Sequence, residues 1–501
     1  MLQLSKIKHQ KTALFIAGIL ASFGFAPVYA VPVFALFLLF ALLICDEAQD
    51  LKQAAKIGYV FGFGFFCGGF YWIANALLVD FVTFGWLYPF ALVAPGAFFA
   101  LFLILPFMVW HFLKNTTPWC KILSFASIIV LMEYVRCFLL TGFAWNMIGT
   151  MFGFSDILLQ SASIVGTYGL SFLMTIMVLC LYAGIQKKYI SAVAVFLLIS
   201  ALMTAFGMYR LKNDDKPSDI AVRIVQPSIA QTLKWDQESL EDNLMDYINL
   251  SRKDGAENVR FVLWGETATA FNPADSAYYQ MLIKKAVPKN GYLMTGLLRY
   301  DEQNDALYNS MSVIDDEGQT VAFYDKNHLV PFGEYIPFRK FLPSWVSPIA
   351  NQMADFAQGE KYKTIELTGL PKFGALICYE VIFPDEVINR RDKPQFLIVL
   401  SNDGWYGKSF GPYQHLLAAK MRAIEEGVTI VRAANNGISA VINPFGQIKT
   451  FLGLNERGVL DVNLPQKLSV STIYAHIGGN AIAIVMGLIL FLVTCFKMIK
   501  S

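Results

Sequence analysis

Long apolar stretches, almost free of charged residues, constrain this chain more than any other feature of its sequence. Six of them are long enough to cross roughly 30 Å of hydrocarbon as single helices. They lie near residues 57–79, 88–112, 122–140, 158–184, 190–209 and 477–496. A further apolar block, 13–45, exceeds one span, and Pro27 disfavours helix in the residue before it, so we expect two short helices at 13–26 and 31–45. The sequence therefore predicts a polytopic α-helical membrane bundle of eight helices, seven before a polar region and one after it.

The charged residues are distributed very unevenly along the chain. Residues 1–210 hold 17 charged side chains, whereas residues 211–475 hold 59. Charged residues make up 16% of the whole chain, against about a quarter in an ordinary soluble domain, which excludes a purely soluble protein. We therefore expect a transmembrane bundle at 1–210, a water-facing domain at 211–475, and a last helix with a short tail at 476–501. The net charge of +2 gives no reason to expect nucleic acid as a partner.

The short loops predict how the chain is oriented, because lysine and arginine are enriched on the cytoplasmic side of a membrane. Lysines occur at both termini and in alternate loops, at positions 6, 8, 11, 52, 56, 114, 121, 187, 188, 497 and 500. The intervening loops near 27–30, 80–87 and 141–157 contain none. We therefore expect both termini in the cytoplasm of a bacterium and 211–475 on the periplasmic side of its inner membrane. The N-terminus resembles a signal peptide ending at Ala30, but membrane-spanning sequence follows it at once, so we expect it to be retained.

The water-facing part alternates between strand and helix patterns. Apolar and β-branched runs predict strands at 220–226, 259–264, 292–298, 308–315, 320–326, 373–378, 396–401, 428–433 and 438–442. Helical periodicity predicts helices at 237–253, 275–286 and 412–426. Such alternation is typical of a layered α/β domain in which helices cover sheets. Residues 331–349, rich in proline and aromatics and including Trp345, are expected to form a structured loop that either packs inside the domain or touches lipid beside a site.

Cys378 is the one cysteine of seven that lies in the water-facing part, so no second cysteine there offers it a disulfide. A solitary thiol in an oxidising compartment is a candidate reactive group, although a buried small hydrophobe is an equally ordinary use of cysteine. Cys378 ends the apolar run 373–377, and Pro384 follows closely, where a helix is able to begin. A nucleophile at a strand-to-helix junction is exposed, and nearby backbone amides favour its thiolate.

Two other strand ends carry charged residues in similar positions. Glu266 follows the run 259–265, and Lys326 follows 321–325. Acyl transfer uses a set of three such groups: a carboxylate that takes protons, a cation that favours a thiolate and an oxyanion, and a thiol that attacks. Taken singly, each charged residue is more simply a solvated loop residue, so it is the combination that carries the hypothesis.

These three residues lie within four longer motifs. The motifs are LWGETA at 263–268, YDKNHLVPFGE at 324–334, ICYE at 377–380 and SNDGWYG at 401–407. Together they resemble the regions of the Glu-Lys-Cys triad in the nitrilase superfamily. With the membrane helices added, the chain resembles from end to end the apolipoprotein N-acyltransferases, the bacterial enzymes that add the third acyl chain to lipoproteins. The resemblance implies an α-β-β-α sandwich. One departure from the family pattern is Gly265, where proline is usual.

The resemblance also implies roles for individual residues. Cys378 is the implied nucleophile, Glu266 the general base and Lys326 the group that stabilises charge. Glu334 and Glu380 match further acidic positions that orient the amine or the lysine. Tyr379, Trp235 and Trp405 match aromatic positions associated with substrate binding or mobile loops, and packing in the core is the alternative role for them. Trp345 belongs to the loop 331–349, which we consider as a gate.

Arg136 is a further candidate for a substrate-binding residue, because ionisable groups at membrane depth are energetically costly and usually paired. Glu133 lies three residues away on the same predicted helix, so the two form either a structural ion pair or a contact for a phospholipid head group. His328 and His415 leave a rival Cys-His mechanism open. The sequence has no Cys/His cluster with the spacing of metal ligands and no glycine-rich nucleotide loop, so we expect no metal, no nucleotide and no other cofactor.

The function that the resemblance implies is a two-step transfer of an acyl chain. The donor is a membrane phospholipid, the intermediate is a thioester on Cys378, and the acceptor is the N-terminal α-amine of a diacylglyceryl-cysteine apolipoprotein. Both substrates are lipids, which explains eight helices where one is enough for anchoring. Two alternatives remain open from the sequence: a membrane-tethered amidase or nitrilase that acts on small amides, and a non-enzymatic lipid-binding receptor.

Overall fold

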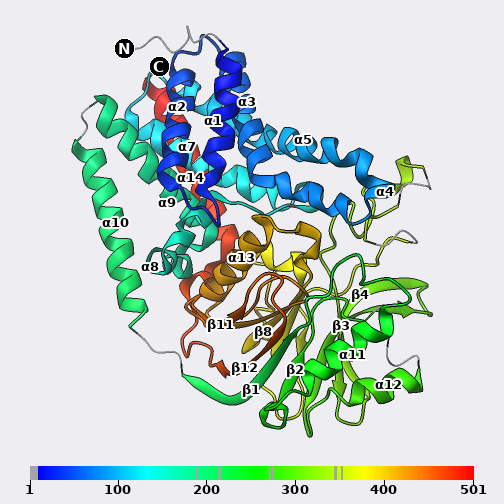
Figure 1. Ribbon diagram of the computed structural model, residues 1–501. Helices are drawn as coiled ribbons and strands as arrows, with labels where there is room; N and C mark the ends of the chain where they lie inside the picture. The colour runs from blue at the N-terminus through cyan, green and yellow to red at the C-terminus, as the bar shows by residue number, and fades with distance from the viewer. Residues whose placement is uncertain are drawn as a thin grey trace. The chain divides into compact units, whose positions relative to one another are not determined.

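The structure is a computed structural model that describes residues 9–187, 190–212, 216–269, 272, 276–343, 347–350 and 354–500. Its internal contacts divide the chain into two compact units (Figure 1). The first unit comprises Met1–Ala74, Trp86–Asn213 and Thr472–Ser501, and the second comprises Asn75–Gly85 and Asp214–Ser471. The segment Asn75–Gly85 therefore groups with the polar part of the chain, although in the sequence it lies between two apolar stretches.

The first unit is helical. Its longer elements are α1 (Gln10–Ala21), α2 (Val31–Asp46), α3 (Leu51–Phe70), α5 (Tyr88–Phe99), α6 (Leu101–Phe112), α7 (Pro118–Arg136), α9 (Ala162–Lys187), α10 (Ile190–Arg210) and α14 (Ile473–Lys500). Within the described ranges, six spans are long and apolar enough to cross a membrane: Leu51–Leu78, Phe81–Phe112, Pro118–Arg136, Ala162–Gly184, Ile190–Arg210 and Ile473–Met498. They match the six long stretches predicted from the sequence, so the predicted membrane bundle is confirmed. α1 and α2 have only 12 and 16 residues, so the number of crossings is not fixed at eight.

The helix expected at 122–140 ends earlier than its apolar sequence suggests. α7 stops at Arg136, and Leu140 and Thr141 have φ angles of 52° and 80°. The N–H of Phe143 donates to the carbonyl of Arg136 at 2.8 Å, which turns the chain away from the helix axis. Backbone conformation, which hydropathy does not report, therefore sets this helix end.

Glycines bring α1 and α3 into close contact. A Cβ added to Gly18 overlaps the carbonyl oxygen of Phe61, and one added to Gly64 overlaps the carbonyl oxygen of Phe15. Small residues let helix backbones approach in this way in membranes, where close packing replaces the hydrophobic driving force between helices. The two helices therefore depend on glycine at both positions.

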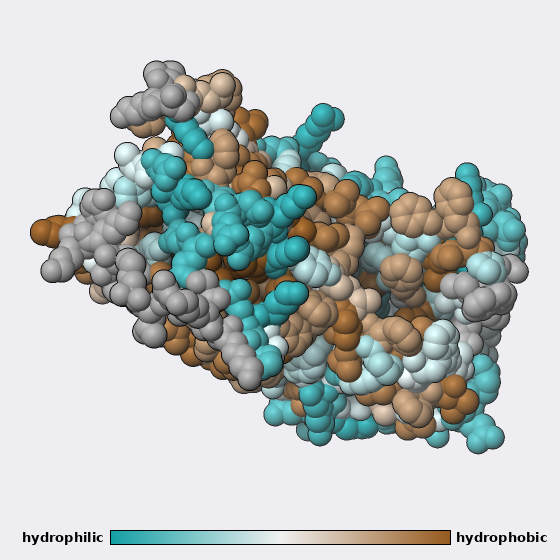
Figure 2. All heavy atoms as spheres, turned by 90° about the horizontal axis from the view of Figure 1, so that it is seen from above, coloured by the Kyte–Doolittle hydropathy of each residue, from teal (hydrophilic) through white to brown (hydrophobic). Residues whose placement is uncertain are grey.

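Polar contacts close one end of the bundle, whereas its outer helices are apolar. Asp46, the last residue of α2, accepts hydrogen bonds from Trp110 at 2.9 Å, from Lys121 at 2.7 Å and from Tyr182. Hydrophilic side chains gather over the end of the bundle where α1 begins and α14 ends (Figure 2). α10 and α14 expose apolar side chains such as Leu197 (59%) and Leu488 (55%), which suits surfaces that face lipid.

The second unit contains two six-stranded sheets. The first has the order β12 (Gly458–Pro465), β1 (Pro217–Gln226), β2 (Phe261–Leu263), β3 (Tyr292–Asp301), β4 (Ala306–Asp315) and β5 (Thr320–Asp325). The second has the order β11 (Ile448–Leu452), β10 (Ser439–Ile442), β9 (Thr429–Ala434), β8 (Phe396–Ser401), β7 (Phe373–Ile377) and β6 (Thr364–Ile365). β1, β2 and β3 run parallel, as do β7, β8 and β9. All nine predicted strands are present, and β6, β11 and β12 were not predicted.

The two sheets pack face to face and are covered by helices on their outer faces. Val222, Phe261, Phe373 and Ile398 belong to the buried core that the two sheets share. A second apolar cluster joins the other face of the first sheet to α11 (Leu240–Ser251) and α12 (Ala277–Lys284). α13 (Gly411–Glu426) packs against β9 and β10 of the second sheet. These layers form the predicted α-β-β-α sandwich (Figure 1).

The aromatic loop expected at 331–349 is exposed over much of its described length. Phe332, Phe338 and Phe341 are 57%, 63% and 85% exposed, so burial inside the domain does not explain them. The N–H groups of Ile349 and Ala350 nevertheless donate to the carbonyls of residues 332 and 333, at 3.0 and 2.8 Å, which braces the loop. Trp345, predicted to belong to a gate, lies outside the described residues.

Candidate active site

Segments that follow two strands of the first sheet bring two carboxylates and an ammonium group together. Glu266 follows β2, Lys326 follows β5, and Glu334 lies in the loop after Lys326. Lys326 Nζ lies 2.9 Å from Glu334 Oε1 and 3.5 Å from Glu266 Oε1. All three residues are buried. Although burial opposes the charge, Glu334 and then Glu266 raise the pKa of Lys326 well above its usual value, so this side chain remains an ammonium ion.

Asn309 on β4 links the two carboxylates. Its Nδ2 donates to Glu266 Oε1 at 2.8 Å and to Glu334 Oε1 at 2.9 Å. The N–H of Lys326 donates to the carbonyl of Asn309 at 2.8 Å, so the same residue also fixes the backbone of the lysine. Within the described part of the chain, Glu266 Oε2 has no hydrogen-bond partner. One oxygen of Glu266 is therefore held in place while the other remains available to accept a proton.

Cys378 directly follows β7 of the second sheet and has a strained backbone. Its φ of 52° lies in the left-handed region, as at a sharp turn that presents a side chain. The thiol is buried, and Sγ lies 3.9 Å from the hydroxyl of Tyr406. Burial first, and then Glu266, raise the pKa of Cys378 well above its usual value, although Lys326 and the N–H of Asn402 act in the opposite direction. The expectation that the strand end exposes this thiol is wrong, because Cys378 is 4% exposed. Its burial also outweighs the cation and the amide, so the thiol is favoured over the thiolate.

Glu380 fixes the turn that carries Cys378. Its Oε2 accepts from the N–H of Ile377 at 2.6 Å, and its Oε1 accepts from Tyr324 Oη and the N–H of Asn327, both at 2.8 Å, and from the N–H of His328 at 3.1 Å. These donors come from the strand before the cysteine and from the segment around Lys326. Glu380 therefore joins the two segments, and its carboxylate is fully occupied in doing so.

The two histidines are both placed beside a carboxylate, which their sequence spacing did not reveal. His415 Nδ1 lies 2.8 Å from Asp403 Oδ1, and its Nε2 donates to the carbonyl of Cys378 at 3.0 Å. His328 Nδ1 lies 3.1 Å from Glu386 Oε2. Because His415 contacts the carbonyl of Cys378 and not its sulfur, the geometry does not favour the rival Cys-His mechanism.

Asp403 and Arg432 complete a buried cluster with His415. Arg432 donates to both carboxylate oxygens of Asp403 at 2.9 Å, and neither residue is more than 1% exposed. Burial opposes the charge of Asp403, but Arg432 and His415 outweigh it and hold its pKa at about 2. Through His415, this ionised cluster holds the backbone carbonyl of Cys378.

The predicted aromatic residues differ in their surroundings. Tyr379 is buried and packs edge-on against His328 and Phe383, with ring centroids 5.6 and 5.0 Å apart. Trp235 and Trp405 are half-buried in loops that follow β1 and β8. Tyr406, the neighbour of Trp405, is the residue that contacts the thiol, and sequence reasoning passed over it in favour of the tryptophan. Burial and then Cys378 raise the pKa of the Tyr406 hydroxyl well above its usual value, so it remains a donor.

Close backbone packing positions Glu266. A Cβ added to Gly265 lies 2.8 Å from Asn435 N and 3.2 Å from Ser401 O, and both are backbone atoms of the second sheet or its connections. On the other side, a Cβ added to Gly296 of β3 lies 2.6 Å from Gly265 O. Glycine at 265 therefore lets the segment that carries Glu266 pass between backbones, which gives this departure from the usual proline a structural consequence.

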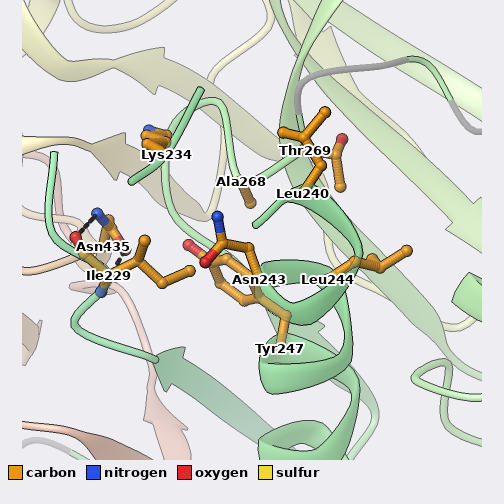
Figure 3. Close-up of a pocket in the computed structure, with 9 residues that line it drawn as sticks. All are labelled: Ile229, Lys234, Leu240, Asn243, Leu244, Tyr247, Ala268, Thr269 and Asn435. Carbon is orange, nitrogen blue, oxygen red and sulfur yellow. Dashed lines mark hydrogen bonds between the residues drawn. The ribbon is translucent and has the colours of Figure 1, made fainter. Parts of the chain in front are cut away.

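Lys234, in the loop between β1 and α11, is a second buried ammonium group near Glu266. Its Nζ donates to the carbonyl of Glu266 at 2.8 Å and to Thr267 Oγ1 at 2.6 Å. It also lines a small pocket together with Leu244 and Tyr247 of α11 (Figure 3). The loop has no periodic pattern, so Lys234 carries no signal in the sequence beyond its place beside Trp235.

Arg136 belongs to the first unit. Its guanidinium lies over the rings of Phe66 and Phe99, 5.5 and 5.8 Å from their centroids, and the residue is 3% exposed. Glu133 Oε1 accepts from the N–H of Ile148 at 2.7 Å. Both ionisable side chains therefore face the interior of the helical unit.

Two family models match the chain. One, described as carbon-nitrogen hydrolase, covers residues 221–474, and the other, described as apolipoprotein N-acyltransferase N-terminal domain, covers residues 17–180. A protein of Rickettsia typhi named apolipoprotein N-acyltransferase is 36% identical over 490 residues, which cover 96% of this chain and 97% of that protein. The chain belongs to the apolipoprotein N-acyltransferase family.

A second named relative agrees with this assignment to the apolipoprotein N-acyltransferases. A protein of the same name from Rhodopseudomonas palustris is 36% identical over 507 residues, which cover 96% of this chain and 94% of that protein. Among solved structures, Nit3 of Saccharomyces cerevisiae, a member of branch 10 of the nitrilase superfamily, is 19% identical with a TM-score of 0.38 and covers 50% of this chain and 93% of that protein. Family membership and the six long apolar spans identify this apolipoprotein N-acyltransferase relative as a bacterial membrane protein.

Proposed function

We propose that this protein transfers an acyl chain from a membrane phospholipid to the N-terminal α-amine of a diacylglyceryl-cysteine lipoprotein, through a thioester on Cys378. The observation that carries the proposal is the buried set of Glu266, Lys326 and Cys378 in a chain that is related over its whole length to apolipoprotein N-acyltransferases. The relatives' name supplies the acceptor class. The phospholipid donor and the thioester are our inference from the chemistry of the site.

The first step forms the acyl-enzyme. Glu266, through its unpartnered Oε2, takes the proton of the Cys378 thiol as the sulfur attacks an ester carbonyl of the phospholipid. The carbonyl oxygen becomes an oxyanion, which the ammonium of Lys326 stabilises. The C–O bond to the glycerol then breaks, Glu266 returns the proton to the leaving oxygen, and a lysophospholipid departs. The neutral resting thiol of this site makes the base necessary at the start of the step.

The second step consumes the thioester. The free α-amine of the lipoprotein attacks the thioester carbonyl, and Glu266 takes a proton from the nitrogen. The C–S bond breaks, the sulfur of Cys378 recovers the proton, and the product is an amide. Thioesters react readily with amines, and a buried site slows their loss to water. Asn309 and Lys326 hold Glu266 in both steps, and Glu334 holds Asn309 and Lys326; none of these three exchanges a proton with the substrates.

Both proposed substrates are lipids, so we assign the membrane-spanning unit a part in their delivery. We propose that both termini lie in the cytoplasm and that residues 211–475 lie on the periplasmic side. The support is the distribution of lysine between alternate short loops. Labelling a cysteine introduced at exposed Lys253 with a membrane-impermeant maleimide in spheroplasts tests this orientation, and labelling only after lysis would contradict it.

The test of the reaction is intact mass spectrometry of the full chain in mixed micelles with a synthetic dipalmitoyl phosphatidylethanolamine. We expect an adduct of one palmitoyl group on the wild type, none on Cys378→Ala, and loss of the adduct in neutral hydroxylamine. A synthetic diacylglyceryl-cysteine peptide with a free α-amine is expected to remove the adduct and gain the same mass. The same peptide with an acetylated amine is the matched control and is expected to leave the adduct in place.

The outcomes separate this function from its alternatives. Hydrolysis of small amides without an acyl adduct would replace the proposal with a membrane-tethered amidase. A folded protein with an accessible Cys378 that performs neither reaction would support a lipid-binding receptor.

A further inference from the structure

Thr267, directly after Glu266, has a backbone conformation that is unusual for its residue type. Its φ is 44°, in the left-handed region, where a β-branched side chain is strained. The residue is 8% exposed. Such a conformation persists only where the surroundings hold it, and the group that holds the Thr267 hydroxyl is the ammonium of Lys234, at 2.6 Å.

The same ammonium also fixes the backbone of Glu266. Lys234 Nζ donates to the carbonyl of Glu266 at 2.8 Å, so two of its three N–H bonds are directed at one turn. The backbone of the turn is confined on its other side, because a Cβ on Gly296 lies 2.6 Å from Gly265 O and 2.7 Å from Glu266 Cα. The turn is therefore clamped between β3 and the Lys234 side chain.

Lys234 is buried among the charged groups of the site. It is 6% exposed, and the titratable groups that act on it are Glu266 and Cys378, while Lys326 and Glu334 lie beyond Glu266. Burial lowers the pKa of Lys234 to about 8, against the opposing effect of Glu266. The side chain is thus a charged donor at neutral pH, in a position where a neutral residue would be easier to bury.

We propose that Lys234 is a positioning residue for the general base: it clamps the strained Glu266–Thr267 turn and so keeps the Glu266 carboxylate beside Lys326, where it serves Cys378. This inference rests on the proposed function, because it gives Glu266 the role of base. Lys234 itself exchanges no proton with the substrate.

The test measures the rate of palmitoyl transfer to Cys378 from dipalmitoyl phosphatidylethanolamine in the full chain. Lys234→Met keeps the length of the side chain and removes the charge and both hydrogen bonds to the turn. Lys289→Met, at an exposed lysine of the same unit, is the matched control. We expect Lys234→Met to lower the saturating rate by about 100-fold, with the half-saturating lipid concentration unchanged, and Lys289→Met to have no effect.

A comparison with Glu266→Gln separates positioning of the base from general damage to the fold. If Lys234 acts through Glu266, the double variant Lys234→Met/Glu266→Gln reacts no more slowly than Glu266→Gln alone. Two effects that multiply, or a loss of less than threefold in Lys234→Met, would overturn the proposal. Thr267→Val removes only the hydroxyl contact, and we expect about a tenfold loss that disappears in the Lys234→Met background. If Lys234→Met does not fold, Thr267→Val takes its place in the comparison with Glu266→Gln.

A second measurement keeps this inference distinct from the proposed function. If the wild type forms no acyl adduct, the function fails, and alkylation of Cys378 by chloroacetamide is then followed by peptide mapping in the same variants. Slower alkylation in Lys234→Met that is not additive with Glu266→Gln would still support the positioning role. Equal alkylation rates in the wild type and Lys234→Met would overturn it.

Discussion

Replacing Asn309 with leucine tests how the site holds two carboxylates close to one lysine. The amide nitrogen of Asn309 donates to Glu266 Oε1 and to Glu334 Oε1, at 2.8 and 2.9 Å, inside a buried strand. Leucine has nearly the same size and shape but donates nothing. After the change, Lys326 is the remaining group that holds the two Oε1 atoms, and its contact with Glu266 is the longer one, at 3.5 Å.

The magnitudes expected for stability and for activity differ. Two hydrogen bonds to charged acceptors contribute roughly 1.5–3 kcal/mol each, so their loss costs about 3–6 kcal/mol. The change also removes Asn309 Oδ1, which is buried without a partner among the described residues and whose desolvation costs about 1–3 kcal/mol. The net loss in the free energy of unfolding is therefore about 2 kcal/mol. The acylation rate is expected to fall by about 100-fold, because Glu266 loses the contact that aligns it.

The assay combines the rate of palmitoyl transfer to Cys378 with the thermal unfolding midpoint of the solubilised protein. Asn304→Leu is the matched control, because Asn304 also donates to a carboxylate, that of Asp301 at 3.0 Å, but on an exposed loop. We expect the control to change the free energy of unfolding by less than about 0.5 kcal/mol and the rate not at all. An Asn309→Leu variant that acylates within threefold of the wild type would refute the view that this amide aligns the base.

Three further changes address other parts of the site. Asp403→Asn is expected to lower the free energy of unfolding by about 2 kcal/mol at pH 7. A carboxyl group whose pKa is about 2 in the folded protein stabilises the fold above about pH 4. The difference in unfolding midpoint between the variant and the wild type should therefore shrink as the pH falls toward 2. Gly265→Ala places a Cβ 2.8 Å from Asn435 N, so the free energy of unfolding measured by thermal unfolding should fall by about 1–3 kcal/mol, and the acylation rate should fall with it. An unchanged acylation rate would contradict the close packing. Lys326→Met removes a charge that lowers the pKa of Cys378, so alkylation of that thiol by chloroacetamide at pH 7.5 should slow about tenfold or more, and an equal rate would argue against electrostatic coupling.

The elements that the sequence predicts well are those with strong apolar patterns. β8 is buried along its whole length and reads as a continuous apolar run, whereas β11 alternates between half-buried and exposed positions and gives a weaker signal. β6 has two residues, too few for any pattern. The end of α7 was placed too late because the apolar composition continues past the residue where the backbone turns.

The proposed triad of Glu266, Lys326 and Cys378 has a sequence signal, because each residue follows a predicted strand and lies in a motif that resembles those of the nitrilase superfamily. Asn309 lies within a strand, and its proximity to Glu266 depends on the order of the strands, in which β4 lies between β3 and β5. Lys234 lies beside Glu266 because β1 and β2 are parallel neighbours, so the loops that follow them meet at one edge of the sheet. Neither fact is contained in the local sequence.

The protonation state of Cys378 shows why charge must be considered for the whole site. The site described above includes two carboxylates, Glu266 and Glu334, two ammonium groups, Lys326 and Lys234, and a neutral thiol. A change in total charge is expensive in a buried site, and moving a charge within it costs less. In the proposed mechanism, proton transfer from the thiol to Glu266 moves one negative charge from oxygen to sulfur, and attack on the carbonyl moves it to the oxyanion, while the total stays constant. The burial that raises the pKa of Cys378 is therefore compatible with the proposed catalysis, because Lys326, which acts to lower that pKa, stabilises the charge along this path.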